Sequence, residues 1–280
     1  MEVIVARTAG FCSGVKRTVK GAEKKLQEHS RIYCLGDIIH NPDVVTSLKE
    51  QGMVVVHDTR QVPRGSRFVV RSHGLDRTAL HQAEQKGLKI HDFTCPKVKK
   101  IHYLVQELTE QDSFIHIIGN RDHPEVQAVV SLAGQNYRVV QHPDEVETMK
   151  GYRSVTCVVQ TTFNPRQFLE ITKRIVFLNK KTVVYNTLCE ETINRQQEAA
   201  SLAEQVDLVL VVGGKHSSNT RSLYELVREH TRAVHIENAG DIKNEWFEHA
   251  ARVGIVSGAS TPRQEVERVY YHLTNSTLCQ

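Results

Sequence analysis

The sequence predicts an α/β protein with mainly parallel sheets, and three observations support this fold class. Short apolar runs of strand length recur along the whole chain of 280 residues. Each run leads into a turn containing Gly, Pro or Ser, followed by a stretch with the apolar spacing of a helix. The alternation occurs three times with similar spacing. Strands that alternate with helices are typical of parallel sheets, in which ligands lie beyond the carboxyl ends of the strands.

In the first third of the chain, an apolar run at residues 3–6 leads to Cys12 and then to a helical stripe that ends at Leu26. Four further runs of strand length follow, at residues 32–35, 54–57, 68–70 and 90–93. The turns between them contain His40 and His73, so polar groups follow the strands where ligands are expected.

The middle third begins with Cys95, after which apolar residues at helical spacing predict a helix up to Leu108. The strands expected here lie at residues 114–118, 137–140, 155–159 and 182–185. The last third begins with Cys189 and a long helical segment through Val206. Its strands are expected at residues 208–212, 233–236 and 253–256.

The three cysteines are followed at equal intervals by polar turn residues. The residues 28 positions after the three cysteines are His40, His123 and Ser217 respectively. A third set of turns contains Ser72-His73-Gly74, Thr161-Thr162 and Ser257-Gly258-Ala259-Ser260. We therefore predict three similar α/β units, residues 1–95, 96–188 and 189–280, each with a mainly parallel four-stranded sheet. Their ligand-binding edges are expected to face a shared centre in a pseudo-threefold arrangement.

Composition narrows the class of protein. Forty per cent of residues are hydrophobic and 24% are charged, which is ordinary for a globular protein. The net charge of +4 is mild and the basic residues form no dense block, which argues against nucleic-acid binding. The longest apolar run, residues 208–212, is far shorter than the ~20 residues of a membrane helix. The first strand runs directly into the Cys12 motif without a secretory signal, so we expect a cytoplasmic protein.

Three of the six cysteines are candidates for metal binding. Cys12, Cys95 and Cys189 each stand at or near a predicted helix N-terminus, where the helix dipole and backbone N–H groups favour the thiolate. Three protein ligands would leave one metal position open for a substrate. The alternatives are three core cysteines, or zinc with three cysteines and one His or Glu. Spacing alone does not decide between zinc and an iron–sulfur cluster. The remaining cysteines are interpreted as structural: Cys34, Cys157 and Cys279.

The whole pattern resembles the 4-hydroxy-3-methylbut-2-enyl diphosphate reductase family from Gly10 to about Pro262. The resemblance rests on motifs that occur in order: Gly10-Phe11-Cys12-Ser13-Gly14-Val15, His40-Asn41, Ser72-His73-Gly74, Asp92-Phe93-Thr94-Cys95-Pro96, His123-Pro124-Glu125-Val126, Gln160-Thr161-Thr162, Asn194-Arg195-Gln196, Ser217-Ser218-Asn219 and Gly258-Ala259-Ser260. Any one motif is weakly specific, whereas the ordered set is strong.

The resemblance implies a [4Fe–4S] cluster bound by Cys12, Cys95 and Cys189, with one iron open to the substrate hydroxyl. It also implies reductive removal of that hydroxyl as water, which gives isopentenyl and dimethylallyl diphosphate in the last step of the non-mevalonate isoprenoid pathway. Electrons would arrive singly from a ferredoxin or flavodoxin. We expect a monomer, because three units complete the site within one chain.

The resemblance also implies roles for polar residues. Glu125 is expected to be the proton donor, because a carboxyl in a closed pocket keeps its proton near neutral pH. Thr161 would orient the acid and the substrate hydroxyl. The diphosphate would be bound by side chains that follow strands: His40, His73, His123, Thr162, Ser217, Ser218, Asn219 and Ser260. Simpler structural roles stay open for some of these, since His40 and Ser217 are also suitable helix caps and His73 an ordinary turn residue.

One departure from the family pattern affects the prediction. Glu190 and Glu191 follow the third cysteine where the family usually has a small residue and threonines. Carboxylates pointing inward would oppose a diphosphate. The alternatives are therefore a paralogue acting on another phosphorylated substrate, a cluster protein for electron transfer or sensing, and a zinc hydrolase.

Overall fold

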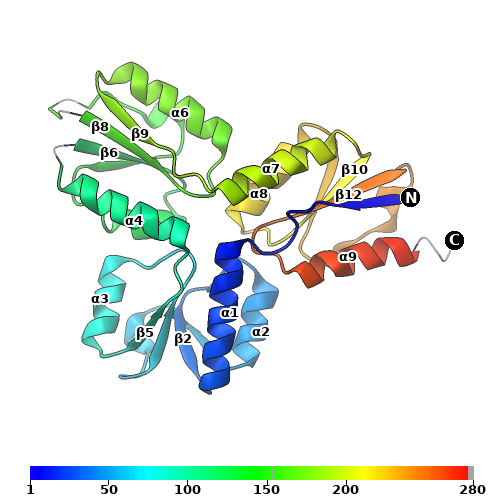
Figure 1. The fold of residues 1–280 in the computed structure, drawn as a ribbon, viewed down its shortest axis with the longest axis horizontal. Coiled ribbons are helices and arrows are strands. Elements are labelled where there is room, and N and C mark those ends of the chain that lie inside the picture. The colour runs from blue at the N-terminus through cyan, green and yellow to red at the C-terminus, as the bar shows by residue number, and fades with distance from the viewer. Residues whose placement is uncertain (112, 150, 153, 277–280) are drawn as a thin grey trace. The chain divides into compact units, whose positions relative to one another are not determined.

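A computed structural model of the chain describes residues 1–111, 113–149, 151–152 and 154–276 (Figure 1). Its twelve described strands form three four-stranded sheets, and every described strand pair is parallel. The α/β class, the three sheets and the four strands in each sheet are thereby confirmed. Cys279, predicted to be structural, lies outside the described residues.

One sheet has the order β3-β2-β4-β5. Its strands and helices are β2 (Ile32–Leu35), β3 (Met53–Val56), β4 (Arg67–Val70), β5 (Lys89–Asp92), α1 (Ser13–Glu28), α2 (Pro42–Glu50) and α3 (Arg77–Gln85). Phe68 and Cys34 at its centre are fully buried. The strands lie within one residue of the ranges predicted from the apolar runs, because burial on both faces of a parallel sheet requires such runs.

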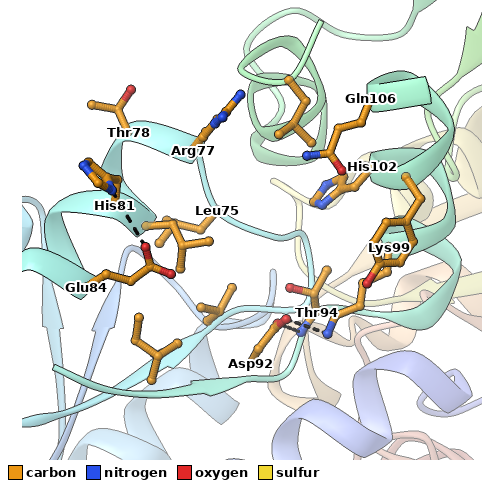
Figure 2. A pocket seen from close by; sticks show the side chains of 15 residues that line it. Leu75, Arg77, Thr78, His81, Glu84, Asp92, Thr94, Lys99, His102 and Gln106 are labelled. Carbon is orange, nitrogen blue, oxygen red and sulfur yellow. Dashed lines mark hydrogen bonds and ion pairs between the residues drawn. The ribbon is translucent and has the colours of Figure 1, made fainter. Parts of the chain in front are cut away.

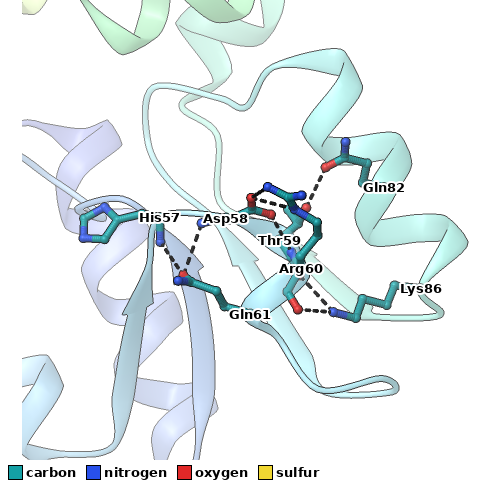
Figure 3. A network of polar contacts seen from close by, with 7 residues as sticks. All are labelled: His57, Asp58, Thr59, Arg60, Gln61, Gln82 and Lys86. Atoms are coloured by element: carbon teal, nitrogen blue, oxygen red, sulfur yellow. Dashed lines mark hydrogen bonds and ion pairs between the residues drawn. The ribbon is translucent and has the colours of Figure 1, made fainter.

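The turn η1 (Thr59–Gln61) joins β3 to β4 and is fixed by a capping box (Figure 3). The Asp58 carboxylate accepts the Arg60 N–H at 2.8 Å, while the Gln61 side chain accepts the His57 N–H at 3.0 Å. Lys86, at the end of α3, donates to the carbonyl of Arg60 at 2.7 Å. The network therefore connects η1, the turn that precedes β4, to the end of α3.

A second sheet has the order β7-β6-β8-β9. Its elements are β6 (Ser113–Ile118), β7 (Tyr137–Val140), β8 (Ser154–Val159), β9 (Thr182–Tyr185), α4 (Pro96–Thr109), α5 (Pro124–Val130), α6 (Pro165–Leu178) and the turn η2 (Pro143–Glu145). Ile171 and Ile175 of α6 pack in a buried cluster with Val155 and Val159 of β8. On α4, Ile101 and Val105 share another cluster with Ile115 and Ile117 of β6.

The third sheet has the order β1-β12-β10-β11. Its elements are β1 (Glu2–Val5), β10 (Leu208–Val212), β11 (Arg232–Ile236), β12 (Arg252–Ser257), α7 (Glu190–Ala203), α8 (Ser218–Arg228), α9 (Arg263–Ser276) and the turns η3 (Ala239–Asp241) and η4 (Asn244–Phe247). All five residues of β10 are completely buried.

The position of β1 corrects one expectation. The sequence assigned residues 1–95 to one unit, but β1 pairs with β12, with Val3 opposite Val253 and Val5 opposite Ile255. The apolar β12 is buried and needs a parallel neighbour on that side, which β1 supplies. The boundaries at residues 95 and 188 fall at turns between sheets and stay a prediction.

By compactness the chain divides into two units. The first comprises Met1–Lys16, His40–Val45 and the chain from Glu190 onward, and it contains the third sheet. The second comprises Arg17–Ile39 and Thr46–Cys189, with the other two sheets. Among the described helices, none is both long and apolar enough to cross a membrane.

Candidate substrate and metal site

In the second unit, a buried carboxyl lies at the start of α5. Glu125 is 2% exposed, and its two oxygens accept hydrogen bonds from the backbone N–H and the hydroxyl of Thr161, each at 2.7 Å. Burial raises the pKa of Glu125, against the lowering effect of the two Thr161 bonds. The carboxyl is therefore poised to keep a proton that an exposed glutamate would lose.

Two histidines adjoin this carboxyl. His123 is the N-cap of α5, and its Nδ1 accepts the Glu125 N–H at 3.2 Å. The rings of His73 and His123 meet edge to face with centroids 5.4 Å apart. The turn after β4, which carries His73, thus meets the turn after β6, which carries His123.

Cys95 and Cys189 belong to the same region of the second unit. Cys95 is the N-cap of α4 and its N–H donates to the Ser72 carbonyl at 2.9 Å, while the Cys189 N–H donates to the Thr161 carbonyl at 2.9 Å. Burial raises the pKa of Cys95, the N–H groups of Lys97 and Val98 lower it, and the nearby Cys189 and Glu125 raise it further. The two cysteines and the acid therefore lie within electrostatic range of one another.

The side chain of Thr162 forms a hydrogen bond with Gln160. Its hydroxyl accepts a hydrogen bond from the Gln160 amide at 3.0 Å, and the Gln160 carbonyl oxygen accepts the Asn120 N–H at 3.0 Å. These bonds link the turn after β8 to the turn after β6. Gln160 therefore positions Thr162, a role that the motif alone does not specify.

In the first unit, Cys12 occupies the turn between β1 and α1. Its N–H donates to the Ala259 carbonyl at 3.0 Å, and its Sγ accepts the Val15 N–H at 3.4 Å. The sulfur therefore receives a backbone N–H at the start of a helix, as thiolate chemistry favours.

Arg195 stabilises the turn that carries Cys12. It is 4% exposed and donates to the Ser257 carbonyl at 2.7 Å and to the Gly10 carbonyl at 2.9 Å. Gly10 has a φ of +114°, a conformation that favours glycine. Sequence reasoning missed this structural role, although Arg195 stands in one of the motifs.

The first unit also brings His40, Ser260 and Gly214 of the turn after β10 together. The Ser260 hydroxyl donates to the His40 carbonyl at 2.9 Å. A Cβ on Gly214, in the turn after β10, would lie 3.1 Å from the same carbonyl, so this close approach favours glycine.

The Ser217-Ser218-Asn219 segment begins α8. Ser217 is its N-cap, and the hydroxyl accepts the Thr220 N–H at 3.3 Å, as the capping interpretation predicts. Ser218 is the first helical residue and is half-buried. Asn219 is 5% exposed, and its amide nitrogen has no hydrogen-bond partner among the described residues. A buried donor without a partner is costly, which suits a residue that binds a polar ligand.

The Glu191 carboxylate forms hydrogen bonds with Ser13 at the start of α1. Its carboxylate accepts the Ser13 N–H at 2.9 Å and also the Ser13 hydroxyl. A carboxylate at the first residue of α1 satisfies backbone donors and complements the helix dipole. Glu191, two residues after Cys189, therefore stabilises the start of α1, the helix that follows Cys12.

Beyond the predicted residues, a cavity of about 840 Å³ lies between α3 and α4 (Figure 2). On its rim Lys99 pairs with Asp92 at 2.5 Å, and Asp92 accepts the Thr94 N–H at 2.8 Å. None of the side chains predicted to bind substrate lines it. The cavity instead abuts the segment that leads into Cys95.

The cysteines fit a metal-binding group better than a core role. Cys12, Cys95 and Cys189 are half-buried, whereas Cys34 and Cys157 are fully buried in strands. Burial raises the pKa of both Cys34 and Cys157 to about 12, so these thiols stay protonated. Only the three turn cysteines, among the described ones, combine access with helix N-termini.

The fold is that of an α/β protein in which thiols, imidazoles, hydroxyls and a buried carboxyl follow the carboxyl ends of parallel strands within each unit. This arrangement is typical of enzymes that act on small ligands. The chain belongs to the LytB protein family, whose sequence model matches residues 3–274.

Curated relatives match almost end to end. The chain is 39% identical over 274 residues to 4-hydroxy-3-methylbut-2-enyl diphosphate reductase of Trichlorobacter lovleyi, covering 98% of both sequences. It is also 39% identical to the reductase of the same name from Aquifex aeolicus, covering 96% of this chain and 94% of the relative.

Solved structures agree with these matches. The E-1-hydroxy-2-methyl-but-2-enyl-4-diphosphate reductase from Plasmodium falciparum superposes with a TM-score of 0.92 at 27% identity, covering 98% of this chain and 88% of that one. A structure of (E)-4-hydroxy-3-methyl-but-2-enyl diphosphate reductase, described as the terminal enzyme of the non-mevalonate pathway, gives a TM-score of 0.75 at 37% identity, with 98% and 100% coverage.

Proposed function

We propose that this chain is a 4-hydroxy-3-methylbut-2-enyl diphosphate reductase. It removes the substrate hydroxyl with two electrons and two protons, forming water and the isopentenyl and dimethylallyl diphosphates. Family membership and the named relatives support the activity. The buried Glu125 carboxyl, held by Thr161 close to Cys95 and Cys189, is the observation that carries the proposal.

We propose that Cys12, Cys95 and Cys189 bind a [4Fe–4S] cluster. When bound, the cluster supplies the electrons one at a time and offers one iron without a protein ligand. The half-buried thiols at helix N-termini support this assignment. The electrons come from a one-electron carrier such as a ferredoxin or flavodoxin, and the reaction takes place in the cytoplasm.

Glu125 is the proposed source of the proton that leaves with the hydroxyl oxygen. Its raised pKa keeps the carboxyl protonated, and the hydrogen bonds from Thr161 fix its direction. After donating, the carboxylate is stabilised by the same two bonds. Thr161 therefore limits the cost of forming a buried charge.

The diphosphate is bound by neutral and positive donors that follow the strands. We assign this role to His40, His73, His123, Thr162, Ser217, Ser218, Asn219 and Ser260. The unsatisfied amide of Asn219 supports its assignment most directly. N–H groups at the start of α8 provide further donors for a phosphate.

The test is anaerobic purification with iron and sulfide analysis, followed by a reductase assay with a reduced one-electron donor. Four irons per chain and turnover that is lost in Glu125→Gln, with iron retained, are the expected results. Glu110→Gln, an exposed glutamate at the end of α4, is the matched control. A chain that retains iron but does not turn over this substrate would favour the paralogue, whereas a chain without iron would overturn the cluster assignment.

A further inference from the structure

Positive charge is concentrated at the starts of α1 and α4. The first two turns of these helices contain six cations: Lys16, Arg17, Lys20, Lys97, Lys99 and Lys100. No acidic residue precedes Glu23 in α1 or Glu107 in α4. Cations near a helix N-terminus oppose the helix dipole, so this clustering does not stabilise either helix. Binding to something outside the chain explains it better.

Helix α1 packs against the turn that leads into Cys95. Arg17 donates from its guanidinium to the Thr94 carbonyl at 3.0 Å, and the Thr18 hydroxyl donates to the Phe93 carbonyl at 2.9 Å. A Cβ on Gly21 would lie 2.6 Å from the Phe93 ring, so the helix approaches this turn closely. The cations of α1 that follow residue 16 therefore lie beside the start of α4, within the second unit (Figure 1).

The lysines of α4 lie on two flanks of the helix. Val98 and Ile101 are buried, and Lys97 and Lys100 each precede one of them by one position. Both lysines are therefore rotated about 100° from the core in the same direction. Lys99 is rotated the opposite way, to the rim of the cavity between α3 and α4, where it pairs with a carboxylate. No described residue of α1 lines that cavity, so the flank with Lys97 and Lys100 is the one toward α1.

Four cations thus form one surface, which we call the basic patch: Arg17, Lys20, Lys97 and Lys100. Three of them are exposed and Lys97 is half-buried. Within the described part of the chain, neither Lys20 nor Lys100 forms an ion pair. The patch therefore presents uncompensated positive charge to solvent, directly beside the turn that carries Cys95.

We propose that the basic patch is the docking surface for a one-electron carrier protein with an acidic face, an inference that rests on the proposed function. Each encounter moves one electron from the reduced carrier to this chain at the Cys95 turn, and the carrier leaves oxidised. Two encounters supply the two electrons that one turnover consumes. The protons arrive separately, one of them from Glu125.

An acidic carrier suits this surface for two reasons. Opposite charges on two proteins speed their encounter and orient it without requiring a tight complex, which suits a carrier that must leave after each electron. The patch also adjoins Cys95, so a carrier bound there brings its redox group toward one of the proposed cluster ligands. None of the side chains assigned to the diphosphate belongs to the patch, so the carrier and the substrate do not compete for the same groups.

The experiment is a calorimetric titration of the intact, anaerobically purified protein with an oxidised acidic [2Fe–2S] ferredoxin as the probe. Lys20→Glu with Lys100→Glu should weaken binding about tenfold or more, because each new carboxylate repels the acidic face. Added salt should weaken wild-type binding, since exposed charges are screened. Lys20→Arg with Lys100→Arg keeps the charge and should retain the affinity.

The matched control is Arg31→Glu with Arg64→Glu, which changes the net charge equally. Both arginines are exposed and precede strands β2 and β4, so they lie at the end of the sheet opposite to Cys95. This pair should bind ferredoxin as the wild type does. If Lys20→Glu with Lys100→Glu does not fold, Lys20→Gln with Lys100→Gln tests the same patch and should weaken binding less.

Turnover supplies the second measurement. With reduced ferredoxin, kcat/KM for the carrier should fall by the same factor as the affinity in the patch variant. With reduced methyl viologen, a small molecule that needs no docking surface, the patch variant should match the wild type. A wild type without turnover on methyl viologen would count against the proposed function, while the titration would still test the patch.

Three results would overturn the proposal. They are unchanged ferredoxin binding in the patch variant, an equal loss of binding in the Arg31 and Arg64 control, and an equal loss of turnover with ferredoxin and with methyl viologen.

Discussion

Thr161 holds Glu125 through both carboxylate oxygens, with the backbone N–H on one oxygen and the hydroxyl on the other, each at 2.7 Å. The two residues are 36 positions apart and follow neighbouring strands, β6 and β8, of one parallel sheet. Because the carboxyl is 2% exposed, its charged form depends almost wholly on these two donors. This dependence gives the first two predictions.

The free energy of unfolding should fall with rising pH because of Glu125. Burial raises its folded pKa above the ordinary value of 4.5, so the folded state binds the proton more tightly than the unfolded state does. This stabilising contribution is complete below the ordinary pKa and is lost as pH rises through the folded pKa. Glu125→Gln should therefore show a flatter profile in urea unfolding as the pH rises above 4.5.

The exposed Glu110→Gln variant is the control for this measurement and should retain the wild-type slope. Parallel profiles for the wild type and Glu125→Gln would show that the carboxyl titrates normally.

Thr161→Val should slow the reaction and move its alkaline limb. The substitution removes the hydroxyl donor, and since the Thr161 bonds lower the pKa of Glu125, that pKa should rise further. We expect kcat to fall about tenfold to hundredfold near neutral pH, while activity persists to higher pH. Thr161→Ser should restore both features. An unchanged alkaline limb in Thr161→Val would remove Glu125 as the acid.

The strands of this fold follow closely from the sequence. Runs such as residues 208–212 are buried on both faces, so their composition is nearly enough to locate them. The motif turns also assemble at the ends of strands as expected, since parallel strands place their carboxyl ends at one edge. The pairing of β1 with β12 could not be predicted, because the three apolar residues of β1 carry no information about which strand it pairs with.

The contacts that individual side chains make also could not be predicted from the sequence. The sequence left open whether Glu191 points inward, where it would oppose a diphosphate; in the structure it accepts the N–H and hydroxyl of Ser13. Arg195 was known only as part of a motif, although it fixes the Gly10 and Ser257 carbonyls. Both directions depend on contacts between segments more than 150 residues apart, which local spacing does not reveal.

The five described cysteines should separate into two groups on substitution. Alanine at Cys12, Cys95 or Cys189 should abolish iron binding, measured as iron and sulfide per chain. Cys34→Ala and Cys157→Ala should retain iron and cost about 1 kcal/mol or more through the cavity left in the core. Because their pKa values are about 12, Cys34 and Cys157 should also resist thiol alkylation in the folded protein. Iron loss in either strand variant, with folding preserved, would contradict this division.

Asn219→Ala should weaken substrate binding without destabilising the fold. The buried amide nitrogen has no partner in the described part of the chain, so its removal relieves a desolvation cost while deleting a donor to the diphosphate. We expect KM to rise about tenfold, equivalent to about 1.4 kcal/mol, with an unchanged or higher melting temperature.

Asn164→Ala is the matched control for Asn219. Asn164 caps α6 by accepting the N–H groups of Arg166 and Gln167 at 2.9 and 3.1 Å. Its loss should lower stability by about 1 kcal/mol and leave KM unchanged. The assignment of Asn219 fails if its own variant shows the same pattern as Asn164→Ala.

Glu191→Ala should loosen the turn that carries Cys12. The carboxylate accepts the N–H and hydroxyl of Ser13, which directly follows Cys12 and begins α1. Losing a cap costs about 1 kcal/mol, so unfolding should occur at lower denaturant and iron should be released faster to a chelator. Glu190→Ala tests the neighbouring carboxylate as the control, and Glu191→Gln should recover part of the loss because its amide oxygen still accepts. Equal iron release from all three variants would mean that Glu191 does not support the Cys12 turn.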